Sequence, residues 1–283
     1  MIGLFDSGYG GLAITRELIK QYPNFSYRYL GDNARAPYGV RSKEEILDFT
    51  IQGVDFLLTS GCPLVILACN TSSANALRTI QQEYLPKKWP DRKVLGIIVP
   101  TVEQMTGTAW EALDKNHLRK EVIGVLATPM TVASEAYTVE ILKRAPNMTV
   151  VEQACPTLVP LIEQGLWDEA NAELEIYIHE LEEKMKSKQI SWPPDAILLG
   201  CTHYELLANH LRTILPPIVK LYLQSHIVAA SLKEYLSRHP EIADRLNREG
   251  KREYFTTADP ELVSNNAKIF MDPAPEFQQI TLQ

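Results

Sequence analysis

Short apolar runs alternate with longer amphipathic stretches along most of the chain. Apolar runs of strand length occupy residues 2–5, 27–30, 64–68, 94–98, 122–126, 148–152 and 196–199. Stretches with helical spacing lie between them at residues 11–21, 72–83, 132–144, 168–186 and 203–214. A further helix is expected to begin near Ser42, where Glu45 completes a capping box. This alternation is typical of α/β proteins with mostly parallel sheets.

The strand and helix pattern begins a second time near residue 122. IGLFDSG starts at Ile2 and IGVLATP at Ile123, while LACNTSSANAL and LGCTHYELLAN each follow a buried strand. We therefore predict an α/β fold of two pseudo-symmetric, doubly wound domains with mostly parallel sheets and an active site in the cleft between them. The predicted domains are residues 1–98 with 211–283, and residues 99–210. Their boundaries fall at residues 99–101 and at the Pro216-Pro217 pair.

The tail after Pro216 is expected to return to the first half. It contains a strand pattern at residues 218–223, a helix pattern at 227–237, another strand at 253–256 and a last helix.

Composition narrows the class of protein. The chain has 283 residues, of which 45% are hydrophobic, enough for one large or two smaller cores. A formal charge of −7 argues against direct nucleic-acid binding, which needs an excess of Lys and Arg. Four cysteines make no disulfide framework and favour a reducing compartment. With no signal-peptide pattern and no apolar run of about 18 residues, we expect a soluble cytoplasmic protein with no membrane partner.

The candidate chemistry lies where strands end. Ligands of open α/β sheets bind outside the carboxyl ends of the strands. Asp6-Ser7-Gly8, residues 32–39, Cys69-Asn70-Thr71 and Cys201-Thr202-His203 all occupy such loops. A helix N-terminus lowers a thiol pKa and attracts carboxylates, so both cysteines could be thiolates near an anionic substrate.

Each of the two cysteines has a proton-exchanging group close by. His203 follows Cys201 by two residues, and Asp6 comes from the strand expected beside that of Cys69. Two acid–base groups on opposite sides of a cleft suit removal of a proton from one face of a carbon and its return to the other. The competing interpretation is that both cysteines only pack, as we expect of Cys62 and Cys155. The histidine spacing predicts no metal site.

Six ordered stretches carry a family resemblance. GLFDSGYGGL, GDNARAPYGVRS, ACNTSSANAL, GVLATPMTVASEAY, ACPTLVPLIEQG and LGCTHYELL, together with TTADPE near the C-terminus, resemble glutamate racemases of the aspartate/glutamate racemase superfamily. The resemblance implies interconversion of L- and D-glutamate with no cofactor and no metal, supplying D-glutamate for peptidoglycan synthesis. It also implies a homodimer. The two-half pattern predicts, in addition, that the two domains move relative to each other and close over the ligand.

The resemblance also assigns roles to residues. Cys69 and Cys201 would be the two bases, Asp6 would assist Cys69, and His203 would assist Cys201. Glu163 matches a further acidic residue of the family site. The substrate would be bound by residues of the strand-end loops: Asp6, Ser7, Tyr38, Gly39, Asn70, Thr71, Thr202 and His203.

Three residues depart from the usual family pattern: Asn33, Glu205 and Gln224. Asn33 and Glu205 are expected near the pocket mouth, which leaves aspartate, or several amino acids, open as the substrate. Amide hydrolysis by Cys201 and His203 is another possibility, although it gives Cys69 no role. A non-catalytic amino-acid-binding or regulatory protein, such as a gyrase inhibitor, is the remaining alternative.

Overall fold

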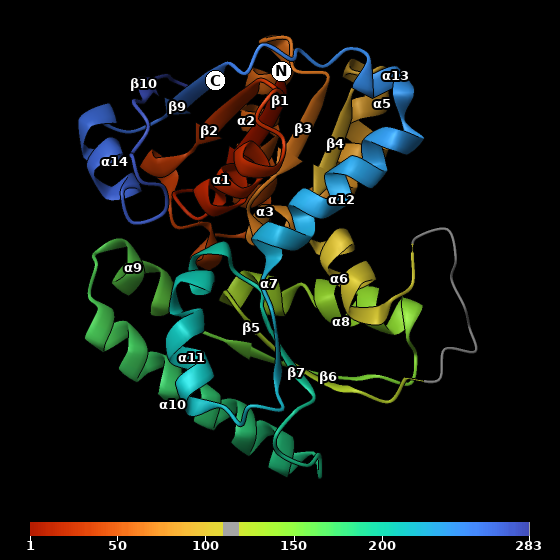
Figure 1. The fold of residues 1–283 in the computed structure, drawn as a ribbon, viewed down its shortest axis with the longest axis vertical. Coiled ribbons are helices and arrows are strands. Elements are labelled where there is room, and N and C mark those ends of the chain that lie inside the picture. The colour runs from red at the N-terminus through yellow and green to blue at the C-terminus, as the bar shows by residue number, and fades with distance from the viewer. Residues whose placement is uncertain (110–118, 283) are drawn as a thin grey trace.

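The computed structural model describes residues 1–109 and 119–282, which form two α/β units, each built on a parallel sheet (Figure 1). The six-stranded sheet lies in the upper half of Figure 1 and the four-stranded sheet in the lower half. All strand pairings of both sheets are parallel, as the sequence pattern predicts.

The first sheet has the order β10-β9-β2-β1-β3-β4. Its strands are β1 (Ile2–Asp6), β2 (Tyr27–Gly31), β3 (Leu64–Leu67), β4 (Lys93–Gly96), β9 (Arg252–Thr256) and β10 (Gln278–Gln279). Its helices are α1 (Gly11–Gln21), α2 (Lys43–Thr59), α3 (Asn70–Asn75), α4 (Leu77–Thr79), α5 (Leu85–Lys88), α12 (Gln224–Arg238), α13 (Pro240–Ala243) and α14 (Pro260–Ala267). The register sets Asp6 beside Gly31, so the strand-end loops emerge at one edge of the sheet.

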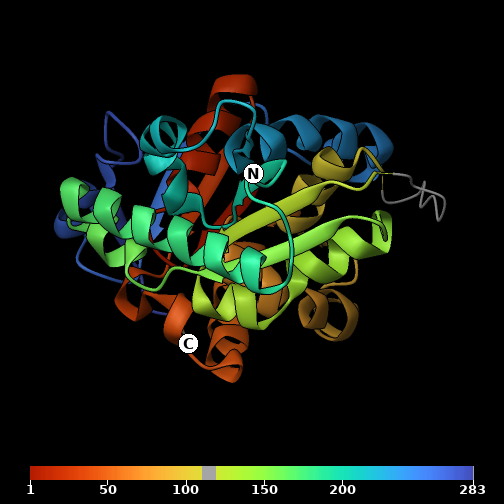
Figure 2. The same ribbon diagram turned by 90° about the horizontal axis from the view of Figure 1, so that it is seen from below.

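The second sheet has the order β6-β5-β7-β8. Its strands are β5 (Val122–Ala127), β6 (Thr149–Ala154), β7 (Ala196–Leu199) and β8 (Lys220–Tyr222). Its helices are α6 (Ile98–Thr106), α7 (Pro129–Ala133), α8 (Ala136–Arg144), α9 (Leu158–Glu163), α10 (Trp167–Ser187) and α11 (Ala208–Ile214). Figure 2 shows α10 crossing the face of this sheet that is turned away from the first unit.

The strand order confirms the predicted halving. The first sheet contains the neighbouring strands β2-β1-β3-β4, and the second sheet has the equivalent order β6-β5-β7-β8. Each strand of the second sheet therefore has a counterpart in the first, and the chain builds the same arrangement twice.

The position of β8 corrects one expectation. The strand pattern at residues 218–223 was expected to return to the first half, but β8 pairs with β7 in the second sheet. The repeat gives the reason, because the second half needs a counterpart of β4. The return begins one element later, where α12 packs against α1, and continues where β9 pairs with β2. The exact domain bounds stay a prediction.

Several helices are shorter than their sequence pattern. The stretch predicted as one helix at residues 72–83 begins at Asn70 and is divided into α3, α4 and a π-helical turn, η3 (Ile80–Tyr84). The helix predicted after Cys201 begins as a 3₁₀ helix, η4 (Thr202–Leu207). Two further 3₁₀ turns, η1 (Asn33–Arg35) and η2 (Tyr38–Val40), follow β2. The capping box of Ser42 and Glu45 is confirmed at the start of α2.

Buried strands supply most of the core. Every residue of β1, β3 and β7 is buried, as strands covered by helices on both faces require. Cys62 and Cys155 are fully buried, in agreement with the packing role predicted for them. Among the described residues, no helix combines the length and the apolar character that crossing a bilayer demands.

Candidate functional site

A cavity of about 170 Å³ lies between the carboxyl ends of the two sheets. Its wall comes from loops after β1, β2 and β3 of the first unit and after β5, β6 and β7 of the second. The predicted site residues all line it: Asp6, Ser7, Tyr38, Gly39, Cys69, Asn70, Thr71, Glu163, Cys201, Thr202 and His203. Since a cavity of roughly 150 Å³ holds a benzene molecule, this one suits a small metabolite.

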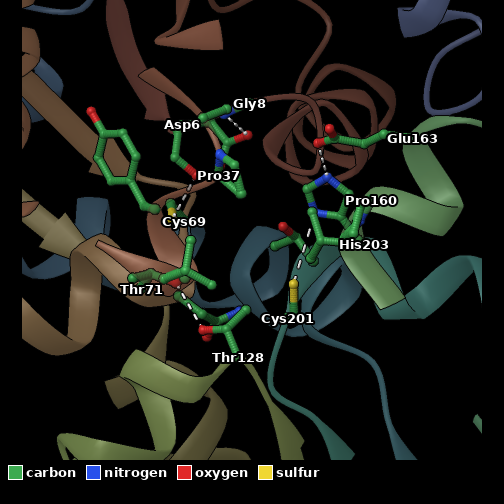
Figure 3. Close-up of a pocket in the computed structure, with 18 of the residues that line it drawn as sticks. Asp6, Gly8, Pro37, Cys69, Thr71, Thr128, Pro160, Glu163, Cys201 and His203 are labelled. Atoms are coloured by element: carbon green, nitrogen blue, oxygen red, sulfur yellow. Dashed lines mark hydrogen bonds and ion pairs between the residues drawn. The ribbon is translucent and has the colours of Figure 1, made fainter. Parts of the chain in front are cut away.

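The two cysteines face the cavity from opposite units. Figure 3 shows Cys69 beside Asp6 on one side and Cys201 beside His203 and Glu163 on the other. Each cysteine follows a buried strand and precedes a helix, β3 and α3 for Cys69, β7 and η4 for Cys201. A carbon atom held between them would have one thiol on each face.

Cys69 is held at the start of α3 by two polar contacts. Its Sγ accepts a hydrogen bond from the backbone N–H of Ser72 at 3.5 Å and lies 3.2 Å from Ser7 Oγ. Burial raises the pKa of the Cys69 thiol, and the negative charge of Asp6 raises it further. Burial therefore opposes the thiolate that the helix N-terminus was expected to favour at Cys69, and its effect on the pKa is larger than that of the N–H groups.

Asp6 ends β1 and is buried beneath the cavity. Its Oδ2 accepts the backbone N–H of Gly8 at 3.1 Å and lies 3.4 Å from Tyr29 Oη. Burial raises the pKa of Asp6, although the charge of His203 and backbone N–H groups partly oppose the shift. A carboxyl group with a raised pKa can hold a proton near Cys69.

Cys201, His203 and Glu163 form a chain of contacts on the other side. His203 Nδ1 lies 3.8 Å from Cys201 Sγ, and His203 Nε2 lies 2.8 Å from Glu163 Oε1. Burial alone would lower the pKa of His203, but the contacts with Cys201 and Glu163 raise it well above its usual value. The His203 imidazole therefore holds its proton more tightly than a free histidine does, and it lies close enough to Cys201 to exchange that proton with it.

Glycine allows the first unit to approach this chain of contacts. A Cβ at Gly10 would collide with Thr202 Oγ1 and stand 2.5 Å from His203 Nδ1. A Cβ at Gly11 would stand 2.7 Å from that of Asp6. Any larger side chain at either position would push α1 away from the site.

Other lining groups suit a small anionic molecule. Thr71 Oγ1 and Thr128 Oγ1, from the two units, lie 3.0 Å apart. Tyr38 and Gly39 also line the cavity, and the Tyr38 hydroxyl group donates its hydrogen to Asp32. The side-chain amide of Asn70, another lining residue, is bonded to Gln224 and Tyr137.

Sequence reasoning missed several lining residues. Thr128 and Pro129 follow β5, a strand end that the search of the loops left out. The signal was present, because matching IGVLATP to IGLFDSG sets Thr128 opposite Ser7. The apolar wall after β6, made by Pro156, Val159 and Pro160, offered no chemical signal. Val40 directly follows the predicted loop at residues 32–39, and the lining residues Gly8, Ala36 and Pro37 lie within the predicted loops without having been given a role.

The three departures from the family pattern do not line the cavity. Asn33 Oδ1 accepts a hydrogen bond from Thr256 Oγ1 at 2.9 Å. Glu205 binds Ser225, and Gln224 binds Asn70. The expectation that Asn33 and Glu205 lie at the pocket mouth is not met. Within the described residues, no group of three or more His, Cys, Asp or Glu side chains could hold a metal ion.

The chain is similar over nearly its whole length to curated glutamate racemases. It is 41% identical to that of Phenylobacterium zucineum over 268 residues, 92% of each chain. It is 40% identical to that of Roseobacter denitrificans over 280 residues, 98% of each chain. No protein-family model matches it.

Solved structures agree with the sequence comparison. A glutamate racemase isoform from Bacillus anthracis matches with a TM-score of 0.84 and 28% identity, covering 100% of this chain and 97% of the other. The Francisella tularensis glutamate racemase, solved in complex with D-glutamate, matches with a TM-score of 0.81 and 28% identity, covering 99% of this chain and 97% of the other. The Pseudomonas fluorescens allantoin racemase shares the fold alone, with a TM-score of 0.50 and 14% identity over 84% of this chain and 91% of the other.

Proposed function

Because this chain belongs to the glutamate racemase family, we propose that it interconverts L- and D-glutamate without a cofactor, using Cys69 and Cys201 as the two bases. The observation that carries the proposal is the placement of these two thiols, one from each unit, on facing sides of one small cavity (Figure 3). A single thiol could remove an α-proton, but inversion needs a donor on the opposite face.

The proton balance of the reaction needs one thiol and one thiolate. The thiolate removes the α-proton from one enantiomer and becomes a thiol, which leaves a planar carbanion. The opposite thiol donates its proton to the other face and becomes a thiolate. No net proton is taken up, and the two cysteines end each turnover in exchanged states, ready for the reverse reaction.

The two thiols have different neighbours. Burial and Asp6 raise the pKa of the Cys69 thiol, while Cys201 Sγ lies 3.8 Å from His203 Nδ1. We propose that each cysteine removes the α-proton of one enantiomer. Asp6, whose pKa is raised by burial, and His203 would receive and return protons on their own sides.

The carbanion must be stabilised in a site that excludes water. Backbone N–H groups at the start of α3 and the hydroxyl groups of Thr71 and Thr128 would bind the substrate carboxylates. The apolar wall after β6 would exclude water and strengthen these interactions. We further propose that the two units close on glutamate, because each contributes half of the wall.

The cellular role follows from this chemistry. We propose that the product D-glutamate supplies peptidoglycan synthesis and that the enzyme acts in the cytoplasm as a homodimer. All four cysteines are free thiols, and the cytoplasm keeps thiols reduced. A two-fold, isologous contact is the commonest arrangement of homo-oligomers.

The test is proton NMR of the purified protein in D₂O, supplied separately with L-glutamate, D-glutamate and L-aspartate. We expect the α-proton signal of both glutamate enantiomers to disappear. Cys69→Ser and Cys201→Ser should each slow racemisation by at least about 100-fold, as expected for removing a general base. Cys62→Ser, at a buried cysteine away from the cavity, should leave the rate unchanged.

Other outcomes would change the assignment. Exchange with aspartate alone would keep the mechanism and replace the substrate. Binding of glutamate with no exchange would overturn the racemase proposal and favour the binding protein.

A further inference from the structure

The first two residues of α12 contact both cysteine loops from behind the cavity. Gln224 and Ser225 are both buried, and neither lines the cavity wall. The helix they begin is the segment by which the chain returns from the second unit to the first. Their side chains reach in two directions, toward the loop after β3 and toward the loop after β7.

Gln224 holds the residue that follows Cys69. Its Oε1 accepts a hydrogen bond from Asn70 Nδ2 at 2.5 Å, and its Nε2 lies 3.2 Å from Asn70 Oδ1. Asn70 is the first residue of α3 and is 2% exposed, so this amide pair fixes the backbone that carries Cys69.

Two more buried groups fix Gln224 itself. Its Nε2 lies 2.8 Å from Tyr137 Oη on α8 and 3.1 Å from Thr101 Oγ1 on α6. Tyr137 in turn donates to Asn70 Oδ1 at 2.6 Å. Buried amides in a network of this kind are costly to leave unpaired, so their positions are strongly determined.

Ser225 holds the loop that carries Cys201 and His203. Its backbone N–H donates to Glu205 Oε1 at 2.8 Å, and its Oγ donates to Glu205 Oε2 at 2.7 Å. Glu205 belongs to η4, two residues after His203. The carboxylate thus caps α12 from η4, where the positive end of the helix also favours a negative charge.

We propose that Gln224 and Ser225 are positioning residues that set the placement of the two cysteine loops relative to each other, Gln224 through Asn70 and Ser225 through Glu205. The inference rests on the proposed two-base function. Because the two residues are adjacent, one peptide unit joins the two loops. Displacement of a reacting group by about 1 Å can lower the rate roughly 100-fold. A rigid connection between the two cysteine loops should therefore matter to catalysis.

The two residues should act on opposite proton transfers, and isotope effects can separate them. Racemisation has an equilibrium constant of one, so any variant changes kcat/KM equally in the two directions. When one thiol is displaced, however, its own proton transfer becomes rate-limiting. Glutamate deuterated at the α-carbon then reacts more slowly only in the direction in which that thiol removes the label.

The experiment measures this isotope effect for both enantiomers in Gln224→Met and Ser225→Ala. We expect each variant to lower kcat by roughly 10- to 100-fold. Gln224→Met should raise the isotope effect with one enantiomer, and Ser225→Ala should raise it with the other. Ser225→Thr, which keeps the hydroxyl group, should restore most of the rate. Glu205→Gln, which alters the same contact, should shift the isotope effect with the same enantiomer as Ser225→Ala.

A matched control variant removes a different hydrogen bond of α12, one that lies farther along the helix than Gln224 and Ser225. Tyr22 Oη donates to Ala229 O at 3.0 Å, so Tyr22→Phe loosens α12 without touching Gln224 or Ser225. It should leave both isotope effects at the wild-type values.

Three results would overturn the inference. One is an equal change with both enantiomers in all variants, which would mean general loosening of the fold. Another is wild-type kcat in both folded variants. The third is a wild type that exchanges no α-proton, which would remove the proposed function and with it this inference, whereas the first two leave the proposed function intact.

Discussion

The two cysteines have different electrostatic neighbours. Burial raises the pKa of the Cys69 thiol and that of the neighbouring Asp6, and the charge of Asp6 raises the thiol pKa further. Cys201 lies 3.8 Å from His203, whose pKa is raised by its contacts with Cys201 and Glu163. The surroundings of the two thiols therefore differ although the two halves share one topology, and the role of each neighbour can be tested by a single substitution.

Asp6→Asn tests the setting of Cys69. The substitution removes a negative charge, so the pKa of Cys69 should fall and more thiolate should exist at neutral pH. Alkylation of Cys69 by iodoacetamide, followed by peptide mass spectrometry at pH 7, should therefore become faster than in the wild type. Turnover should fall in the same variant, because the acid that exchanges protons with Cys69 is gone.

Cys62 is the internal reference for this measurement. It is fully buried away from the cavity, and its alkylation rate should not respond to Asp6→Asn. Unchanged or slower alkylation of Cys69 would contradict the electrostatic role given to Asp6.

Glu163→Gln tests the setting of His203. Burial lowers the pKa of His203, and the variant removes one of the two contacts that raise it, so its pKa should fall. NMR titration of carbon-labelled histidine should record that fall directly. The alkaline limb of the rate profile should move to lower pH with it.

The sign of the accompanying change in stability is fixed by linkage. The folded-state pKa of His203 lies above its usual value of 6.5, so protonation stabilises the fold. That stabilisation is fully present below about pH 6.5 and is lost as pH rises through the folded-state pKa. The difference in unfolding free energy between wild type and Glu163→Gln should therefore shrink as pH rises from 6.5 through that pKa.

A second His–Glu pair provides the control. His210 Nε2 lies 2.9 Å from Glu175 Oε1 on the surface. Because exposed pairs contribute little, Glu175→Gln should change neither the rate profile nor the pH dependence of stability. A pH-dependent loss of the same size in both variants would contradict the role given to the His203–Glu163 pair.

At the scale of elements, the start of α1 packs closely against η4. Gly10→Ala places a Cβ against Thr202 Oγ1 and 2.5 Å from His203 Nδ1. Overpacking of this kind costs about 1–3 kcal/mol of stability, and here the displaced atoms belong to the site. We expect the variant to lose activity by more than its loss of stability explains, as measured by kcat in fully folded protein.

Gly124→Ala is the control that distinguishes a general loss of stability through overpacking from a displacement of the site residues. Its Cβ would stand 2.8 Å from Leu181 Cδ2, in the core of the second unit and away from the cavity. It should lower the unfolding free energy and leave kcat near the wild-type value. Equal kcat in the two glycine variants would show that the contact between α1 and η4 does not position the site.

At the scale of the whole molecule, local sequence patterns predicted the individual strands and helices better than they predicted which sheet each strand joins. The strand ends that carry Asp6, Cys69 and Cys201 could be placed from sequence, because buried strands are apolar runs and ligands bind beyond their carboxyl ends. The sequence did not predict which sheet contains β8. This three-residue strand owes its position to pairing with β7 rather than to its own sequence. Asn33 and Glu205 were misjudged for the same reason, because their partners, Thr256 and Ser225, lie far along the chain.

The division of the site between two units leads to a prediction about ligand binding. A ligand that contacts both walls stabilises only the arrangement in which both are in place. Glutamate at about 100 times its dissociation constant should add about 2.7 kcal/mol of stability. Hydrogen exchange should therefore slow at the carboxyl ends of both β3 and β7, while β10, at the far edge of the first sheet, stays unchanged. Protection of one sheet alone would mean that the ligand is bound by a single unit, which is incompatible with two thiols acting on opposite faces of one carbon.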